Sequence, residues 1–400
     1  MNILFVTPRL PYPLDTGAKI RTFNLIKNIA RRHTVKLLTF LWEDQESACV
    51  KEVEKYVSQV ITIPGPGFSL WRIICGFFVN MFYPMPFVIR KYSSRRMKNE
   101  LKKLLKKEQF DLIHFDHLHM AQYSALVKDK PVVLDEHNIE HTIWHRYRDS
   151  EKNFFKKLLF ALESKRMKRY EEEISKNCNL CLTVSANDMN VLKALSPKSN
   201  VAVISNGVDI DYFFPTDREA EPRNLVYTGS MNWLPNEDAM LYFVKDILPL
   251  IKKEIPDIRL CVVGQSPTEK IRRLSSDEYI VVTGAVADVR PYIAKSQIFI
   301  VPLRIGGGTR LKILEAMAMK KPIVSTAIGY EGIEVTPGSN IVTADNPEEF
   351  SRAIIMLFRD RESRGRYGEN GRKLVEEKYS WEIISLKLEK EYIALKDKII

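Results

Sequence analysis

The 400-residue chain is poor in cysteine and has no long apolar run. Its five cysteines include one CxxC pair, Cys178 and Cys181, and no second pair that would complete a disulfide set. A strand-like run follows this pair, which favours buried apolar thiols over a metal or redox site. No apolar stretch approaches the roughly 20 residues that span a bilayer, and the start MNILFVTP reads as a strand rather than a signal peptide. These absences predict a protein of the reducing cytoplasm.

The net charge of +11 is unevenly spread, and one segment almost lacks acidic residues. Residues 90–107, RKYSSRRMKNELKKLLKK, hold nine Lys/Arg against a single Glu. Residues 68–87 before it are rich in Trp, Phe, Met and Ile. Apolar bulk beside a cationic helix suits a peripheral site on an anionic membrane surface, and a solvated basic face with nothing bound is the alternative. Nucleic acid is not expected as a partner, because no recognised motif accompanies the charge.

The chain alternates short β-branched runs with helical patterns from end to end. The runs are nearly all apolar rather than alternating, which indicates parallel strands covered by helices on both faces. This pattern predicts an α/β fold of doubly wound sheets, and the length predicts two domains. The expected strands are ILFVT, VKLLTF, QVITI, DLIHF, PVVLD, LCLTV and VAVIS in the first half, and LVYTG, RLCVVG, YIVVTG, IFIVP, PIVST and NIVT in the second.

Polar and proline-bearing residues 206–224 separate the two halves. We therefore expect one domain over 1–210 and another over 211–379, with a long helical pattern from 380 to 398 at the end of the chain. Ser185 with Asp188, and Asn346-Pro347 with Glu349, predict capped helix starts. Two doubly wound domains facing one another would put the carboxyl ends of both sheets around one cleft, where ligands bind.

Residues 302–316, PLRIGGGTRLKILEA, break an apolar strand with Gly306, Gly307 and Gly308 before a helical pattern that begins near Thr309. Glycines at such a turn let the backbone approach a ligand, and the helix start is a natural anion site. Two cations, Arg310 and Lys312, in the expected first turn oppose the helix dipole but suit a diphosphate.

Glu315 lies further along the same helix, where its carboxylate suits a ribose diol. The alternative for the whole stretch is a flexible loop with solvated charges. A dinucleotide fingerprint fits poorly, because Leu311 occupies the place of its third glycine.

Further candidates lie in the first half of the chain. Gly17 at a helix entrance would let the backbone approach a phosphate, or serve the turn alone. His137 follows the run PVVLD at a sheet's carboxyl edge, and Asp116 and Glu136 lie at similar edges, where either could touch an acceptor or cap a helix.

His137, His141 and His145 are spaced for one helix face, but no carboxylate or cysteine completes a recognisable metal set. We therefore expect no metal.

The sequence resembles glycosyltransferase family 4, a large group of retaining enzymes with the GT-B fold. The resemblance covers nearly the whole chain and is carried by SNGVDIDYFFP at 205–215, GGGTRLKILEAMAMKKPIVST at 306–326 and TGAKIRTFNL near the start. It is closest to the sugar transferases of bacterial surface-polysaccharide operons. Such a protein would move a sugar from a nucleotide-diphosphate sugar to a lipid-linked or polysaccharide acceptor at the inner face of the membrane.

The resemblance also implies roles for particular residues. The carboxy-terminal domain would bind the donor and the amino-terminal one the acceptor, with the final helix 380–400 crossing back onto the first domain. Glu315 would hold the ribose, Arg310 and Lys312 the diphosphate, and the backbone of Val286 the base. His137 would reach the donor sugar, and Gly17 would lie in a loop that closes over the phosphates. Gly306, Gly307, Gly308, Thr309 and Leu311 complete the expected donor site.

Two departures from the family pattern stand out. The first glutamate of its paired signature should fall eight residues before Glu315, where this chain has Gly307. The segment TGSMNWLPNEDAM also lacks the usual Arg and Lys, which shifts charge neutralisation to Arg310, Lys312 and Arg304. Charge stabilisation by helix ends and cations needs no metal. A sugar-nucleotide epimerase of the same fold, and a non-catalytic scaffold of polysaccharide assembly, remain the alternatives.

Overall fold

The computed structural model describes residues 1–67, 85–151, 153–216, 220–306 and 308–397. The chain forms two compact units, one made of Met1–Ser205 with the residues from Ile384 onward, the other of Asn206–Ile383. The sequence places the first division five residues later, at 210. The second division falls inside the last helix, α16 (Trp381–Asp397). The apolar part of residues 68–87 that suggested membrane contact lies mostly outside the described residues.

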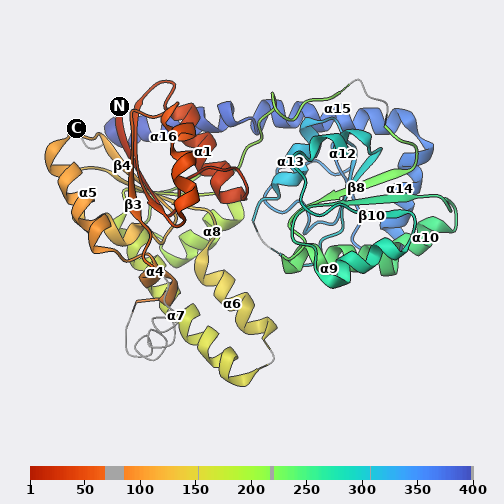
Figure 1. Cartoon of the computed structure of the whole chain (residues 1–400), viewed down its shortest axis with the longest axis horizontal. Coiled ribbons are helices and arrows are strands. Elements are labelled where there is room, and N and C mark those ends of the chain that lie inside the picture. The colour runs from red at the N-terminus through yellow and green to blue at the C-terminus, as the bar shows by residue number, and fades with distance from the viewer. Residues whose placement is uncertain (68–84, 152, 217–219, 307, 398–400) are drawn as a thin grey trace. The chain divides into compact units, whose positions relative to one another are not determined.

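The first unit is built on a seven-stranded parallel sheet in the order β3-β2-β1-β4-β5-β6-β7 (Figure 1). Its strands are β1 (Asn2–Thr7), β2 (Thr34–Leu41), β3 (Gln59–Pro64), β4 (Leu112–Asp116), β5 (Val132–Glu136), β6 (Leu180–Thr183) and β7 (Val201–Val203). Its helices are α1 (Gly17–Ile29), α2 (Val50–Glu54), α4 (Phe87–Lys91), α5 (Arg95–Lys107), α6 (Glu140–Ser150), α7 (Phe154–Asn177) and α8 (Ala186–Leu195). The order places β1 and β4 at the centre, and crossovers run to both sides of them.

The second unit repeats this plan with a six-stranded parallel sheet in the order β10-β9-β8-β11-β12-β13. Its strands are β8 (Asn224–Thr228), β9 (Arg259–Val263), β10 (Ile280–Val282), β11 (Ile298–Val301), β12 (Ile323–Ser325) and β13 (Val342–Thr343). Its helices are α9 (Leu234–Tyr242), α10 (Leu248–Lys252), α11 (Glu269–Arg272), α12 (Arg290–Lys295), α13 (Leu311–Ala318), α14 (Pro347–Arg359) and α15 (Arg361–Lys378). Every strand expected from the apolar runs is present, which confirms the doubly wound α/β prediction.

Local signals in the sequence set several of these boundaries. The Ser185 and Asn346 side chains each accept a hydrogen bond from a backbone N–H in the first turn of α8 and α14, as the capping patterns predict. The Cys178 and Cys181 thiols are both buried, as expected. None of the helices in the described ranges is long and apolar enough to cross a membrane.

Candidate active site

The glycine stretch forms a tight turn between β11 and α13. Gly306 (φ +130°) and Gly308 (φ +78°) both adopt left-handed conformations that L side chains rarely take. A Cβ at Gly306 would stand 2.5 Å from Nη2 of Arg310, so a side chain here would clash with the guanidinium. Gly307 lies outside the described residues. The turn therefore needs glycine both for its backbone angles and for the close approach of a cation.

Arg310 precedes α13 instead of lying in its first turn as expected. Its extended backbone (φ −87°, ψ 94°) makes it the N-cap residue, and the helix begins at Leu311. The Arg310 Nη1 donates to the backbone oxygen of Gly308 at 2.8 Å, which folds the guanidinium back over the turn. Thr309 Oγ1 is buried and has no hydrogen-bond partner among the described residues. The glycine turn, Arg310 and the start of α13 thus form one polar surface.

Lys312 lies in the first turn of α13 and contacts the end of β8. Its Nζ donates to Asn236 Oδ1 at 3.0 Å and lies 4.0 Å from the centre of the Tyr227 ring. The Tyr227 hydroxyl donates to the same Asn236 oxygen at 2.6 Å. An amide and an aromatic face hold the ammonium group without neutralising its charge.

Two further glycines lie at the ends of β8 and β9, and the first of them borders Lys312. Gly229 follows β8 at φ +155°, and a Cβ there would stand 2.7 Å from the Lys312 Nζ. Gly264 follows β9 at φ +152°, and a Cβ there would meet the backbone oxygen of Gly229 at 1.8 Å. The lack of a side chain at Gly264 therefore lets the ends of the two strands approach closely, and the lack of one at Gly229 leaves room for the ammonium group. Neither glycine was expected at the site, although a glycine directly after each apolar strand is a signal that the sequence does contain.

Burial displaces the pKa values of the two titratable side chains at the start of α13. Burial, and then the charge of Arg310, lower the pKa of Lys312 to about 7, against the opposing effect of Glu315. Burial likewise raises the pKa of Glu315 to about 7, against the effect of Lys312. Arg304, which the sequence offered as a further cation, is paired with Asp238 at 2.6 Å. Two neighbouring cations with one weakly ionised carboxyl group favour an incoming anion.

Val286 lies in the loop after β10, in the wall of a groove of about 880 Å³. The described lining of this groove comes from residues around β9, β10 and α12, Cys261, Tyr279 and Tyr292 among them, and includes no residue of the glycine turn or α13. The groove follows the amino-terminal half of β9, whereas Lys312 lies at the carboxyl end of β8. This groove therefore does not include the two cations, and the role of Val286 at the base stays a prediction.

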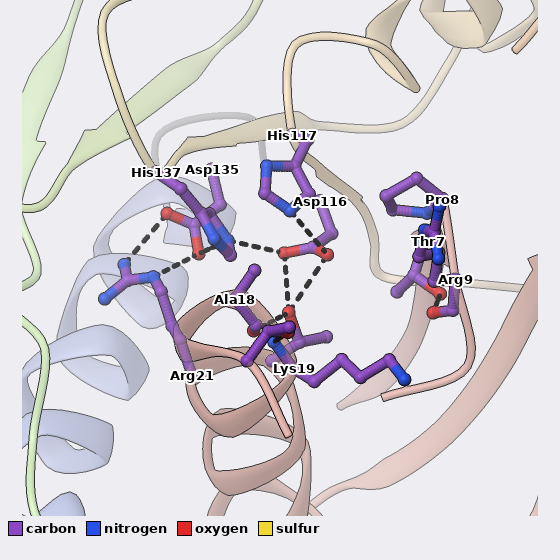
Figure 2. A network of polar contacts seen from close by, with 12 residues as sticks. Thr7, Pro8, Arg9, Ala18, Lys19, Arg21, Asp116, His117, Asp135 and His137 are labelled. Atoms are coloured by element: carbon purple, nitrogen blue, oxygen red, sulfur yellow. Dashed lines mark hydrogen bonds and ion pairs between the residues drawn. The ribbon is translucent and has the colours of Figure 1, made fainter. Parts of the chain in front are cut away.

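In the first unit, His137 lies where β4 and β5 end (Figure 2). Asp116 and Asp135 are register partners in these strands, and His137 follows β5 directly. The His137 Nε2 lies 2.9 Å from Asp116 Oδ1. The Thr22 hydroxyl of α1 reaches both oxygens of the same carboxylate, at 3.1 and 3.0 Å. A buried carboxylate thus orients the imidazole at the carboxyl edge of the sheet.

His117 packs against this pair from the loop after β4. Its backbone is left-handed (φ 68°), and its ring centroid lies 3.7 Å from that of His137. Burial and the neighbouring His137 lower the pKa of His117 to about 3, so it is neutral at pH 7. Burial acts to raise the pKa of Asp116, but His137 and His117 hold it well below its ordinary value. Asp116 is therefore ionised and accepts a hydrogen bond from His137.

Asp135 is held on the other side by Arg21 of α1. The fully buried guanidinium donates to both carboxylate oxygens, at 2.8 and 3.0 Å, and to the backbone oxygen of Ser205 at 3.1 Å. Neither Arg21 nor Thr22 was expected from the sequence. Four polar residues of α1 are buried, Arg21, Thr22, Asn24 and Asn28, and the sequence alone does not distinguish the two that reach the carboxylates.

Two candidates of the first unit, Glu136 and Gly17, make no hydrogen bond with His137 that the structure records. Glu136 is buried, and burial and the neighbouring Glu171 raise its pKa well above its ordinary value. Neither Asp116 nor Glu136 is the N-cap of the helix that follows its strand, and contact of either with an acceptor stays a prediction. Gly17 is exposed at the first residue of α1, where Thr16 provides the cap, so its role at a phosphate stays a prediction.

The helical histidine series expected from the sequence does not form. His137 precedes α6, His141 is paired with Glu171, and His145 with Asp149 at 2.9 Å. The described residues do hold two other groups of metal-binding side chains, Asp116–His117–His137 and His114–Asp116–Asp135, each with one ligand atom per residue within 4.8 Å of the others. Their carboxylates are already engaged by Thr22 and Arg21. We assign no metal to either group.

Two family models match this chain. The one described as Glycosyltransferase Family 4 matches residues 16–212, and the one described as Glycosyl transferases group 1 matches residues 222–360. The matches run through both units. The chain therefore belongs to the glycosyltransferases of group 1/family 4, enzymes that transfer a sugar from a nucleotide sugar. The resemblance found in the sequence is confirmed.

Similar proteins agree with this assignment. A Klebsiella pneumoniae relative, described as an uncharacterized 44.6 kDa protein in the cps region, is 22% identical over 364 residues, 88% of this chain and 90% of the relative. A sucrose-phosphate synthase from Thermosynechococcus elongatus has a TM-score of 0.73 at 15% identity, over 100% of both chains. Anabaena Alr3699/HepE in complex with UDP has a TM-score of 0.71 at 13% identity, over 98% of this chain and 100% of that one. These structures confirm the GT-B fold class.

Proposed function

We propose that the second unit binds a nucleotide-diphosphate sugar with its diphosphate between the glycine turn and the end of β8. The observation that carries the proposal is the half-buried Lys312 ammonium, held by an amide and a ring beside Gly229, where a Cβ would stand 2.7 Å from it. Arg310 and the first N–H groups of α13 add positive charge on the same side. A diphosphate would satisfy these groups and raise the pKa of Lys312 again.

The remaining donor contacts are proposed from the family pattern. Glu315, three residues beyond Lys312 on α13, would accept hydrogen bonds from the ribose hydroxyls. The backbone of Val286 would meet the base, and Gly17 of the first unit would approach the phosphates. Gly307 stands where the family has its first glutamate, and we propose that Lys312 and Arg310 together hold the donor in place of that side chain.

We propose a retaining transfer without a metal ion. As the glycosidic bond to the diphosphate opens, negative charge grows on the leaving group, and Arg310, Lys312 and the helix start stabilise it. His137, oriented by Asp116, would contact the donor sugar, and the donor phosphate would take the acceptor proton. Preorganisation by a buried carboxylate supports a catalytic role for His137, because its ring cannot turn away without losing that hydrogen bond.

We further propose that the first unit binds a lipid-linked or polysaccharide acceptor at the cytoplasmic face of the membrane. One relative is a protein of a cps region, in line with a polysaccharide acceptor. Helix α5 buries Met97, Leu101 and Leu104 and directs its lysines and arginines outward. This arrangement leaves a cationic face that suits an anionic membrane surface.

The donor proposal is tested by thermal shift with UDP, GDP, TDP and ADP sugars. A ligand that binds only the folded protein raises its unfolding free energy by about 2.7 kcal/mol at a hundredfold excess over Kd. Arg310→Ala and Lys312→Ala should each weaken donor binding and turnover by roughly ten- to a hundredfold, as for other hydrogen bonds to charged groups. Lys245→Ala, an exposed cation of the same unit, is the matched control and should behave as wild type.

Three outcomes would overturn parts of this function. Full donor binding by both site variants would remove the diphosphate assignment. Loss of transfer on treatment with EDTA would remove the metal-independent mechanism. Conversion of the donor sugar without any acceptor would point to an epimerase, and the absence of saturable binding to every sugar nucleotide would point to a scaffold.

A further inference from the structure

Helices α6 and α7 form an antiparallel hairpin that extends away from the sheet of the first unit (Figure 1). α7 has 24 residues, a rise of about 36 Å, and its first turns form the tip. Four large apolar side chains are exposed there, Phe154 by 73%, Phe155 by 80%, Leu158 by 53% and Leu162 by 40%. Neither the donor site nor the His137 site uses this tip.

The four side chains lie on one side of α7. Phe154, Leu158 and Leu162 follow at intervals of four residues, and Phe155 is three residues from Leu158, so all four share a helix face. The opposite side of α7 packs on α6, where the Phe160 ring centroid lies 5.9 Å from that of Trp144. The exposed face therefore contributes nothing to the packing of the hairpin. A contiguous apolar face of this kind in water marks an interaction site.

Basic residues surround this apolar face. Lys156 and Lys157 are exposed beside it, and Lys165 and Arg169, also exposed, continue the same face toward the base of the hairpin. Asp149, an acidic residue near the tip, is already paired with Arg148 at 2.7 Å. An apolar tip bordered by lysines and arginines is complementary to a bilayer with anionic headgroups, because the rings can enter the interface while the cations meet the phosphates.

We propose that the tip of the α6–α7 hairpin inserts Phe154, Phe155, Leu158 and Leu162 into the headgroup region of an anionic lipid bilayer. A second copy of the chain fits this surface less well. Four side chains fall far short of the roughly 20–30 residues per partner in a stable interface, and pairing two tips would bring their lysines together. The proposal does not rest on the donor site, and it assigns the apolar contact to α7 rather than to the cationic helix α5.

The test measures binding of the full chain to sedimented vesicles of phosphatidylcholine with and without phosphatidylglycerol. Wild type should bind the anionic vesicles, and Phe154→Ser with Phe155→Ser should weaken the partition coefficient at least tenfold. Phe155→Trp should keep the binding. Leu386→Ser with Ile393→Ser, which changes two exposed apolar residues of α16, is the matched control and should bind as wild type. Circular dichroism and donor-induced thermal shift, both unchanged in the serine variant, would show that the fold and the donor site are intact.

The salt dependence of vesicle binding distinguishes the cationic face of α5 from the tip of the α6–α7 hairpin. A variant of α5 with Lys98→Gln, Lys106→Gln and Lys107→Gln should lose binding mainly at low salt, whereas the serine variant should lose it at low and high salt alike. Equal vesicle binding by the serine variant and wild type would overturn the proposal, as would the absence of binding by wild type. A wild-type dimer that the serine variant converts to a monomer would show that the tip is instead an interface between copies.

Discussion

Lys312 is only partly charged near neutral pH, because burial lowers the pKa of its ammonium group. Asn236 and Tyr227 fix the position of its ammonium group, yet no carboxylate of the described residues forms an ion pair with it, and its pKa is lowered to about 7. Anion binding at this residue must therefore be linked to uptake of a proton above pH 7. The linkage gives the donor site a pH dependence that an ordinary lysine would not show.

We expect the affinity for the sugar nucleotide to fall about tenfold between pH 6 and pH 8, because one pH unit above a pKa of about 7 leaves about a tenth of Lys312 charged. The diphosphate of a sugar nucleotide does not titrate in this range, so the change belongs to the protein. Isothermal titration measures it. Lys312→Met should bind weakly at every pH and lose this part of the decline, and Glu315→Gln, which removes the other side chain with a pKa of about 7, should keep it. A flat wild-type profile would contradict the assignment.

Asp116 acts in our proposal through His137. Asp116→Asn should lower kcat by roughly tenfold or more, as when a general catalytic group is misplaced, with little change in the donor KM. His137→Ala should lose transfer while it still binds nucleotide. The variant with both changes should be no slower than His137→Ala alone, because the carboxylate has nothing left to orient. Additive losses in steady-state kinetics would assign Asp116 a separate role.

At the scale of elements, the strands could be predicted from the sequence. A strand that is buried on both faces is apolar along its whole length, so it can be recognised without knowing which strands lie beside it. The caps at Ser185 and Asn346 were predictable for the same reason, since a cap is a contact within one turn. The start of α13 was misplaced by two residues, because Arg310 takes an extended backbone that follows from the strained glycine turn before it.

The contacts that build the site could not be read from the sequence. Lys312 meets Asn236 across 76 residues and Arg21 meets Asp135 across 114, and only the strand order brings such pairs together. The sequence did identify the triple glycine, the two cations and His137 as candidates, from their residue types and from their positions after apolar strands. Which side chains hold them depends on helix positions that local patterns do not contain. The α6–α7 hairpin was missed because its tip breaks the rule that apolar residues are buried.

Two glycines of α15 allow a matched test of element packing. Gly365 is exposed and a Cβ there would meet nothing within 4 Å, whereas a Cβ at Gly368 would stand 2.2 Å from the backbone oxygen of Lys320. Gly365→Ala should raise the free energy of unfolding by about 0.5–1 kcal/mol. Gly368→Ala should lower it by about 1–3 kcal/mol, because α15 must move away from the end of α13. Urea unfolding measures both, and equal effects would contradict this packing.

At the scale of the molecule, the first unit is completed by the last helix of the chain. Tyr392 of α16 is fully buried, and its hydroxyl lies 2.6 Å from Nδ1 of His114 in β4. Glu389 pairs with Arg32 at 2.6 Å. The central strand of this unit therefore depends on residues that lie beyond the second unit in the sequence.

We expect Tyr392→Ala to destabilise the first unit by about 3–5 kcal/mol, the range for large aromatic truncations in a core. Tyr392→Phe should cost about 1 kcal/mol, since only one hydrogen bond is removed. Hydrogen exchange should speed up in β4 and β5 and change little in β11. Ile393→Ala, on the exposed side of α16, serves as the control. Equal acceleration in both units would show that they do not unfold separately.

The position of α16 has a consequence for synthesis on the ribosome. Protein chains emerge amino terminus first, at about 5–20 residues per second, and domains fold as they become complete. Every strand of the first sheet leaves the exit tunnel early, yet Tyr392 can reach His114 only after the whole second unit has been synthesised. The second unit is a continuous segment and can close while the chain is still tethered. Nascent molecules therefore carry an unfinished amino-terminal core until α16 has emerged, which makes that core the part most in need of chaperone protection.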